Sequence, residues 1–127
     1  MPEPTTILDT INRYAQTFTA GDRDGWLDCF TADATMEDPV GTPLKRGRDE
    51  IGAFYDQSKG SADGVELRVG ADPVVCGSQA AFVLDIVVSL GDSKLGLNAI
   101  DVMTFDDEAK ITSQRAFVDL AKLTPAE

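Results

Sequence analysis

The segment from Leu95 to Phe105 constrains the fold of this chain more than any other stretch of its sequence. It is rich in apolar and β-branched residues and follows the turn-like sequence Gly91-Asp92-Ser93, which predicts a strand. Because side chains alternate across a strand, one face would carry Leu95, Leu97, Ala99, Asp101, Met103 and Phe105. Asp101 is the single polar residue on that face.

Asp101 would place a carboxyl group against apolar side chains, with no basic residue in the local sequence to neutralise it. Burial disfavours the charged form, so such a group stays protonated and can donate a hydrogen bond. A neutral acid in an apolar cavity can stabilise an anion that forms during a reaction. The alternative is that this face is solvated or that a distant Arg pairs with Asp101, which is the commoner situation for a lone strand Asp.

Composition limits the chemistry that is available. The 127 residues include no His, which excludes hydrolases that use Ser-His or Cys-His pairs and most zinc sites. Cys29 and Cys76 lack the spacing of metal or redox motifs, and we expect free, buried thiols. Acid–base chemistry would therefore depend on carboxyl groups, Tyr, Lys or these thiols.

Length and charge restrict the architecture and the partners. A chain of 127 residues with 43% hydrophobic residues predicts one domain, residues 1–127. The net charge of −11 disfavours nucleic acid and membrane surfaces as partners. No apolar run approaches the roughly 20 residues of a spanning helix, and the start Met-Pro-Glu-Pro lacks the basic residues of a signal peptide. We therefore expect a cytoplasmic protein.

The first half of the chain predicts three helices. Ile7, Ile11, Tyr14 and Phe18 recur at helical spacing, so Tyr14 would lie in the core, where its hydroxyl needs a partner or a function. Gly21 ends this helix. Asp22 can cap a short second helix that buries Trp26, Leu27 and Phe30, and a third helix from Arg48 would turn Ile51, Phe54, Tyr55 and Ser58 inward.

A second acidic residue falls at the end of a short strand. In Ala34–Pro39, alternation puts Asp38 on the same inward face as Met36 and turns Glu37 to water. Asp38 would then lie at the rim of a cavity, close to solvent. Such a carboxyl group should remain ionised and could act as a base.

The second half of the chain is predicted to be β-structure, with strands at Val65–Ala71, Ala80–Leu90, Lys94–Phe105 and Lys110–Leu120. The expected fold class is α+β: three N-terminal helices on a strongly curved antiparallel sheet of about four to six strands. The sheet would form a cone around a deep apolar pocket. Its outer face, with Val83, Val87, Ile100 and Val102, is also apolar, which predicts a homodimer through that face.

Tyr14, Asp38 and Asp101 together match a specific kind of chemistry. A base on one side of a cavity and two neutral donors on the other can remove a proton next to a ketone and hold the resulting enolate oxygen.

The sequence resembles the steroid delta-isomerases, also called ketosteroid isomerases, nearly from end to end. The residues that carry the resemblance are Arg13-Tyr14, Asp33-Ala34-Thr35, Glu37-Asp38-Pro39-Val40-Gly41, Gly47-Arg48, Ala53-Phe54-Tyr55 and Ile100-Asp101-Val102-Met103-Thr104-Phe105. The resemblance implies a cystatin-like, nuclear-transport-factor-like fold of the SnoaL-like superfamily, a homodimer, and catalysis without a cofactor or metal.

Position by position, the resemblance also implies catalytic roles. Asp38 matches the base, which moves a proton from carbon 4 to carbon 6 of a 3-oxo-delta-5-steroid. Tyr14 and Asp101 match the donors to the dienolate oxygen, and in this family the donor Asp is kept protonated by its apolar site. Tyr55 matches a Tyr that hydrogen-bonds the first Tyr from behind. The apolar residues expected to line the substrate pocket are Phe54, Phe82, Leu84, Leu97, Met103, Ala116 and Val118.

Three positions depart from the family pattern. Phe30 replaces a Tyr of the hydroxyl network, Val118 replaces a Trp of the steroid slot, and Gln114 stands where a Met is expected. None is the base or a donor, but they leave open which steroid is used.

Two alternative functions remain: a SnoaL-like polyketide cyclase, which also uses a carboxylate and an apolar cavity, or a non-catalytic small-molecule-binding module of the same fold. An epoxide hydrolase would need an inward Arg between two Asp, whereas alternation turns Arg115 outward.

Overall fold

The computed structural model describes residues 1–126. Its first half contains α1 (Pro4–Ala20), α2 (Arg23–Leu27), β1 (Phe30–Glu37), β2 (Lys45–Arg46) and α3 (Gly47–Gly60). The predicted signals act as expected where α1 gives way to α2, but α2 ends at Leu27, so Phe30, which was expected on the second helix, begins β1 instead. Gly21 ends α1 with a positive φ of 76°, which glycine adopts without strain, and the Asp22 side chain accepts a hydrogen bond from the Gly25 backbone N–H.

The second half is almost entirely β-structure. The elements are β3 (Gly64–Val69), β4 (Val74–Cys76), β5 (Gln79–Leu90), β6 (Ser93–Phe105), β7 (Ile111–Val118), a 3-10 helix η1 (Leu120–Lys122) and β8 (Thr124–Pro125). β3, β5, β6 and β7 confirm the four strands that alternation predicted for this half of the chain. β2, β4 and β8 were not predicted, because two or three residues are too few to show a period.

The sheet is mixed. The prediction of a purely antiparallel sheet is therefore wrong. Over residues 1–126 it has eight strands in the order β2-β1-β7-β6-β5-β3, with β4 paired to β5 and β8 to β6. β1 runs parallel to β7, with Met36 beside Gln114 and Glu37 beside Arg115. A parallel pair needs a long crossover connection. Here α3 and the strands β3 to β6 form that connection. Local sequence patterns cannot predict which two strands it brings together.

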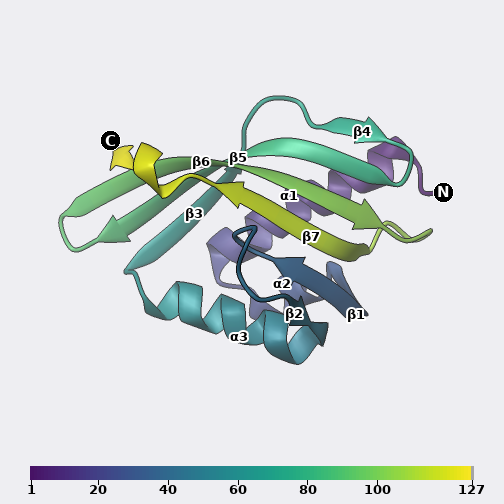
Figure 1. Cartoon of the computed structure of the whole chain (residues 1–127), viewed down its shortest axis with the longest axis horizontal. Helices are drawn as coiled ribbons and strands as arrows, with labels where there is room; N and C mark the ends of the chain where they lie inside the picture. The colour runs from purple at the N-terminus through teal and green to yellow at the C-terminus, as the bar shows by residue number, and fades with distance from the viewer. Residues whose placement is uncertain (127) are drawn as a thin grey trace.

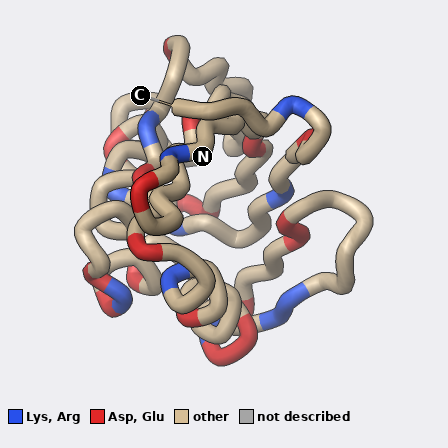
Figure 2. The backbone as a smooth tube through the Cα atoms, turned by 90° about the vertical axis from the view of Figure 1, so that its left-hand side faces the viewer, with Lys and Arg blue, Asp and Glu red and all other residues tan. Residues whose placement is uncertain are grey.

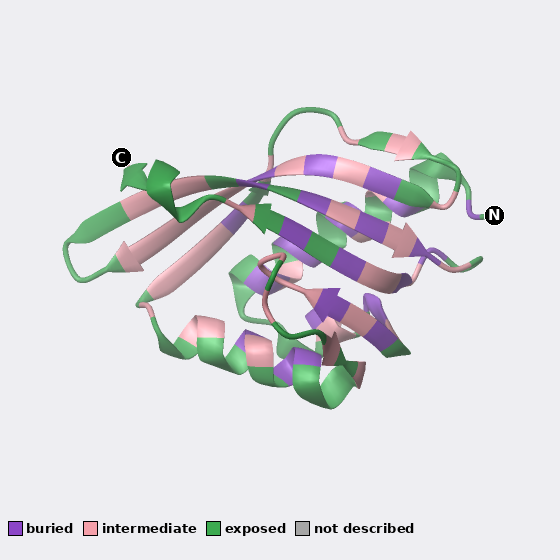
Figure 3. Ribbon diagram, in the orientation of Figure 1, coloured by how far each residue is buried: buried purple, intermediate pink, exposed green. Residues whose placement is uncertain are grey.

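The helices pack on one face of the sheet, and this layer contains the core (Figure 1). The inward residues of α1, Ile7, Ile11, Tyr14 and Phe18, are all buried, as their spacing predicted. Trp26 of α2 is fully buried and lies within ring-stacking distance of Tyr14, Phe18, Phe30 and Tyr55. Buried and less buried positions alternate along β6 and β7 (Figure 3), so the two faces of the sheet differ in environment.

Acidic and basic positions are interspersed along the backbone (Figure 2). Among the helices of residues 1–126, none has the length and apolar character that crossing a membrane requires. Both cysteines are free. Cys29 is buried as predicted, but Cys76 is exposed, because it lies at the end of the short peripheral strand β4.

Candidate active site

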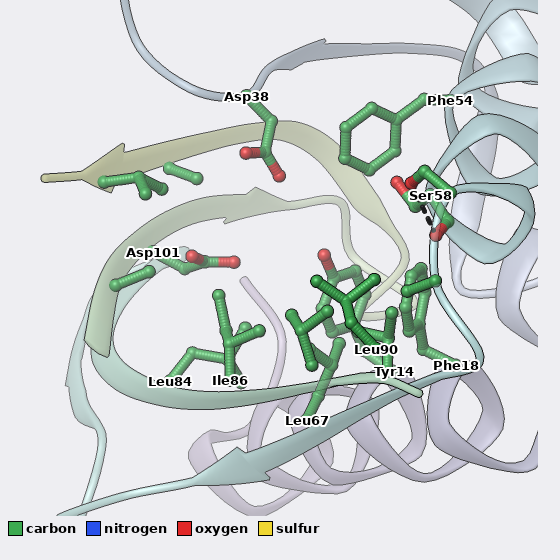
Figure 4. A pocket seen from close by; sticks show the side chains of 17 residues that line it. Tyr14, Phe18, Asp38, Phe54, Ser58, Leu67, Leu84, Ile86, Leu90 and Asp101 are labelled. Carbon is green, nitrogen blue, oxygen red and sulfur yellow. Dashed lines mark hydrogen bonds between the residues drawn. The ribbon is translucent and has the colours of Figure 1, made fainter. Parts of the chain in front are cut away.

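A cavity of about 290 Å³ lies between the helices and the inner face of the sheet. Its wall is mostly apolar, and its acidic and phenolic residues are Asp38, Asp101 and Tyr14. Figure 4 shows the two carboxyl groups and the Tyr14 hydroxyl pointing into this space from three different directions. The volume is close to the lower end of the range for small-molecule sites, about 300–1,000 Å³.

Asp101 occupies the most strongly desolvated position. Its residue is 1% exposed, and in the sheet it lies between Phe82 of β5 and Ala116 of β7, both buried. Its pKa is raised to about 7, chiefly because burial disfavours the charged form, and further because the charge of Asp38 is near. A hydrogen bond from Gln114 opposes this rise. The carboxyl group therefore keeps a proton at pH values where an exposed Asp is ionised.

Asp38 lies in a half-buried position directly after β1. Its neighbours hold it in place: the Val40 backbone N–H donates to the Ala116 carbonyl at 2.8 Å, and Arg115 donates to Glu37 at 3.0 Å. Burial raises the pKa of Asp38, but a hydrogen bond from Gln114 and the positive charge of Lys45 oppose the rise. Of the two acids, Asp38 is therefore the one suited to carry the negative charge.

Tyr14 reaches the cavity from α1. Its ring is 3% exposed and packs against Trp26 and Phe30, with ring centroids 5.7 and 6.1 Å away. Burial, together with the charges of Asp101 and Asp38, raises the pKa of Tyr14 well above its ordinary value. The phenol stays neutral and can act as a hydrogen-bond donor.

Gln114 of β7 connects the two acids. Its residue is fully buried, and its side-chain Nε2 donates to Asp101 Oδ2 at 3.1 Å and to Asp38 Oδ2 at 3.3 Å. The sequence marks Gln114 as a polar residue where the family pattern has a Met, but it gives no sign of these two bonds. The bonds depend on the pairing of β1 with β7, which only the tertiary structure reveals.

The predicted pocket wall is only partly the wall that the structure shows. Phe54, Leu84, Ala116 and Val118 line the cavity. Phe82 and Met103 lie instead in the closed core around Asp101, where they desolvate the acid and do not face the open space. Leu97 also falls outside the lining. β7 pairs with β6 only as far as Val118 opposite Ala99, and Leu97 lies two residues beyond Ala99, outside the part of β6 that lines the cavity.

Further lining residues were not singled out from the sequence. They are Phe18, Ser58, Ser61, Ala62, Val65, Leu67, Ile86, Val88, Leu90 and Ala99. Alternation along β5 turns Ile86, Val88 and Leu90 to the same face as Leu84, and this face lines the cavity. Ser61 and Ala62 belong to the segment between α3 and β3, which has no periodicity to indicate a facing side.

Tyr55 does not take the position expected of it. Among residues 1–126 no hydrogen bond links it to Tyr14. Its ring packs edge-on against Phe18, with centroids 5.2 Å apart. Its pKa is raised by burial, and the charges that act on its hydroxyl are those of Asp22, Arg23 and Asp56. The hydroxyl therefore faces the start of α2: it lies 3.9 Å from where a Cβ on Gly21 would stand, and Tyr55 does not line the cavity.

The part of the chain that the structure describes, residues 1–126, gathers no three Cys, Asp or Glu side chains as ligands for a metal ion. The polar groups of the cavity are instead arranged for proton transfer: an acid suited to carry charge, a neutral acid and a neutral phenol. Removal of a proton beside a carbonyl group, with the oxygen held by the two donors, is within reach of this set.

Comparisons with known proteins show which proteins this chain is similar to. The SnoaL-like domain matches residues 11–114. A Steroid Delta-isomerase from Nocardioides simplex is 39% identical over 111 residues, which cover 87% of this chain and 88% of that protein.

Solved structures agree on the fold. One is of SalBIII, described as an epoxide hydrolase/cyclase-like enzyme in pyran ring formation in the polyether salinomycin. It has a TM-score of 0.88 at 26% identity and covers 99% of this chain and 100% of its own. A protein from Mycobacterium tuberculosis has a TM-score of 0.84 at 18% identity, with the same coverage, and shows the fold alone.

The buried acid makes a prediction about stability. The pKa of Asp101 is higher in the folded than in the unfolded chain, so the folded state binds the proton more tightly. The contribution of Asp101 to wild-type stability should therefore fall as pH rises from about 4 to about 7, by up to roughly 1.4 kcal/mol per pH unit. Asp101→Asn cannot titrate, so urea unfolding should show its stability relative to wild type increasing across this window. A difference that is constant with pH would contradict the raised pKa.

Proposed function

Because this chain belongs to the SnoaL-like domain family, we propose that it is a steroid delta-isomerase that converts 3-oxo-delta-5-steroids into conjugated 3-oxo-delta-4-steroids. The observation that carries the proposal is the meeting of Asp38, Asp101 and Tyr14 in one apolar cavity. The 39% identity to a Steroid Delta-isomerase supports the same reaction.

In the proposed mechanism, ionised Asp38 removes a proton from carbon 4 of the steroid. The electron pair of that C–H bond moves toward the 3-oxo group and forms a dienolate. Tyr14 and Asp101 donate hydrogen bonds to the dienolate oxygen, and both stay neutral because burial disfavours their charged forms. Asp38 then returns the proton to carbon 6. The reaction moves one proton and changes no oxidation state.

The apolar wall suits a flat, largely apolar substrate. Leu84, Ile86 and Val88 form one side of the cavity, and Phe54 of α3 lies on another. We propose that the curved sheet and the helices continue this space as a cone deep enough to hold the ring system, with the 3-oxo end between Tyr14 and Asp101.

A SnoaL-like cyclase is the second candidate, and the similarity to SalBIII is the observation that favours it. The site differs from an epoxide hydrolase arrangement, in which an Arg lies between two Asp. Here the neutral Gln114 occupies that place, and Arg115 faces outward in an ion pair with Glu37. A binding module without catalysis is the third possibility, and the assay below distinguishes it.

We expect Asp38→Asn to lose at least about 100-fold in turnover, because it removes the base while keeping the shape of the side chain. The measurement is the rise in ultraviolet absorbance as 5-androstene-3,17-dione becomes the conjugated product, with circular dichroism to check the fold. If wild-type protein turns over none of several 3-oxo-delta-5-steroids, the proposed reaction is wrong. If Asp38→Asn unfolds, Asp38 is structural.

Tyr14→Phe should lower kcat by about 100-fold and change KM much less, since the lost donor matters most when the oxygen is charged. Tyr55→Phe is the matched control. It removes a hydroxyl that faces the start of α2, so its kcat should stay close to wild type. Equal losses in kcat and in steroid binding for Tyr14→Phe would contradict the donor role.

We also propose that the protein is a homodimer through the outer face of the sheet. Ile100 and Phe117 are adjacent on β6 and β7 and are 49% and 44% exposed. Sedimentation equilibrium should show a dimer for wild type and a monomer for Phe117→Glu. Val74→Glu changes an exposed apolar residue on β4 and should leave the dimer intact. A wild-type monomer would contradict this interface.

A further inference from the structure

Gln114 and Asp101 are the two fully buried polar residues among residues 1–126. Burying an amide is costly unless its hydrogen bonds are made. Its NH2 group has two hydrogens, and two acceptors lie within reach: Asp101 Oδ2 at 3.1 Å and Asp38 Oδ2 at 3.3 Å. One hydrogen can therefore serve each acid.

The sheet places Gln114 between the acids. On β6, Met103 is the register partner of Gln114, and Asp101 is two residues away on the same face. On β1, Met36 is the register partner, and Asp38 is two residues further along the chain. Gln114 is thus the diagonal neighbour of both acids, from the strand that separates them. A side chain of this length can reach both diagonals at once.

One orientation of the amide satisfies both acids at once. If the Gln114 Oε1 atom pointed at the two acids, it would face the carboxylate of Asp38. Both groups are hydrogen-bond acceptors, and no proton would lie between them. The NH2 group therefore points at the acids, and the Gln114 Oε1 atom is left buried without a partner. Among residues 1–126, Oε1 thus has no hydrogen-bond partner, while the NH2 group donates to both acids.

The bond to Asp101 selects which of its oxygens carries the proton. Oδ2 accepts from Gln114, so a neutral Asp101 holds its hydrogen on Oδ1. Oδ1 is buried and has no partner within the described residues. Because Asp101 lines the cavity, we infer that this hydrogen is donated to the oxygen of a ligand seated there.

We propose that Gln114 is a positioning residue, which holds Asp38 and Asp101 in one fixed arrangement and directs the Asp101 proton at the substrate oxygen. This inference deepens the proposed function and rests on it for the identity of that oxygen. The chemical class it implies for the ligand is a ketone or phenol whose oxygen gains negative charge.

The same amide serves both stages of the reaction. Before proton transfer the negative charge is on Asp38, and Gln114 donates to it directly. After transfer the charge is on the dienolate oxygen, which draws the Asp101 proton toward itself and makes Asp101 Oδ2 more negative. The bond from Gln114 to Oδ2 then strengthens, because hydrogen bonds to charged acceptors are stronger. Gln114 therefore stabilises the pair both when Asp38 carries the negative charge and when the dienolate oxygen carries it.

The test is a carbon-13 NMR titration of the two carboxyl groups in wild type and in Gln114→Met, assigned with Asp38→Asn and Asp101→Asn. Met has a similar volume and no donor. Losing the hydrogen bond removes an interaction that favours the charged forms, so both acids should titrate higher, by about one pH unit. Binding of 2-naphthol, whose phenol oxygen resembles the enol oxygen, should weaken about tenfold. Ile111→Val, a change at another buried position of β7, should alter neither measurement.

The outcomes separate this inference from the isomerase proposal, because the titration does not depend on turnover. An inactive wild type contradicts the proposed reaction only. A folded Gln114→Met with unchanged titrations and unchanged naphthol binding overturns the positioning role. If Gln114→Met and Gln114→Leu both fail to fold while Ile111→Val folds, Gln114 is a structural residue and the inference is wrong.

Discussion

The burial of one carboxyl group is the constraint on which the rest of the site depends. Asp101 lies between Phe82 and Ala116 with 1% of its surface exposed, and a charge at that position would be expensive to desolvate. The fold accommodates it by keeping it protonated. The negative charge of the pair is then left to Asp38, which is nearer to solvent and to Lys45. This one difference in environment leaves one Asp neutral and able to donate a hydrogen bond, and the other suited to carry the negative charge.

The pairing of β1 with β7 turns that difference into a site. Asp38 follows β1, Asp101 belongs to β6, and β7 runs between them in the sheet. Without the parallel register, the two acids would have no common neighbour. With it, the fully buried Gln114 reaches both, and Arg115, the next residue, faces the other way and holds Glu37 at the end of β1. Because side chains alternate along β7, Gln114 contacts the two acids of the site, whereas Arg115 points to the other face and holds the end of β1.

The similar proteins bear on what the site can do. A fold shared with an epoxide hydrolase/cyclase-like enzyme and a sequence shared with a Steroid Delta-isomerase would allow more than one reaction. The side chain between the two acids is the feature that separates these chemistries here. A neutral amide leaves the pair with one net negative charge and a proton to donate, which suits the stabilisation of an enolate oxygen. Together with the Tyr14 phenol, it supports the isomerase reaction proposed above.

The sequence by itself determined the α+β class, the amphipathic face of α1, the four long strands, and the inward direction of Tyr14, Asp38 and Asp101. These properties depend on local periodicity, with 3.6 residues per turn in a helix and two in a strand, which a single chain displays directly. Only the tertiary structure decided the parallel pairing of β1 and β7, the hydrogen bonds of Gln114, the direction of the Tyr55 hydroxyl, and the displacement of Leu97, Phe82 and Met103 from the cavity wall. Each of these depends on contacts between segments far apart in the chain. Such contacts are selected by the packing of the whole sheet, and no local pattern records them.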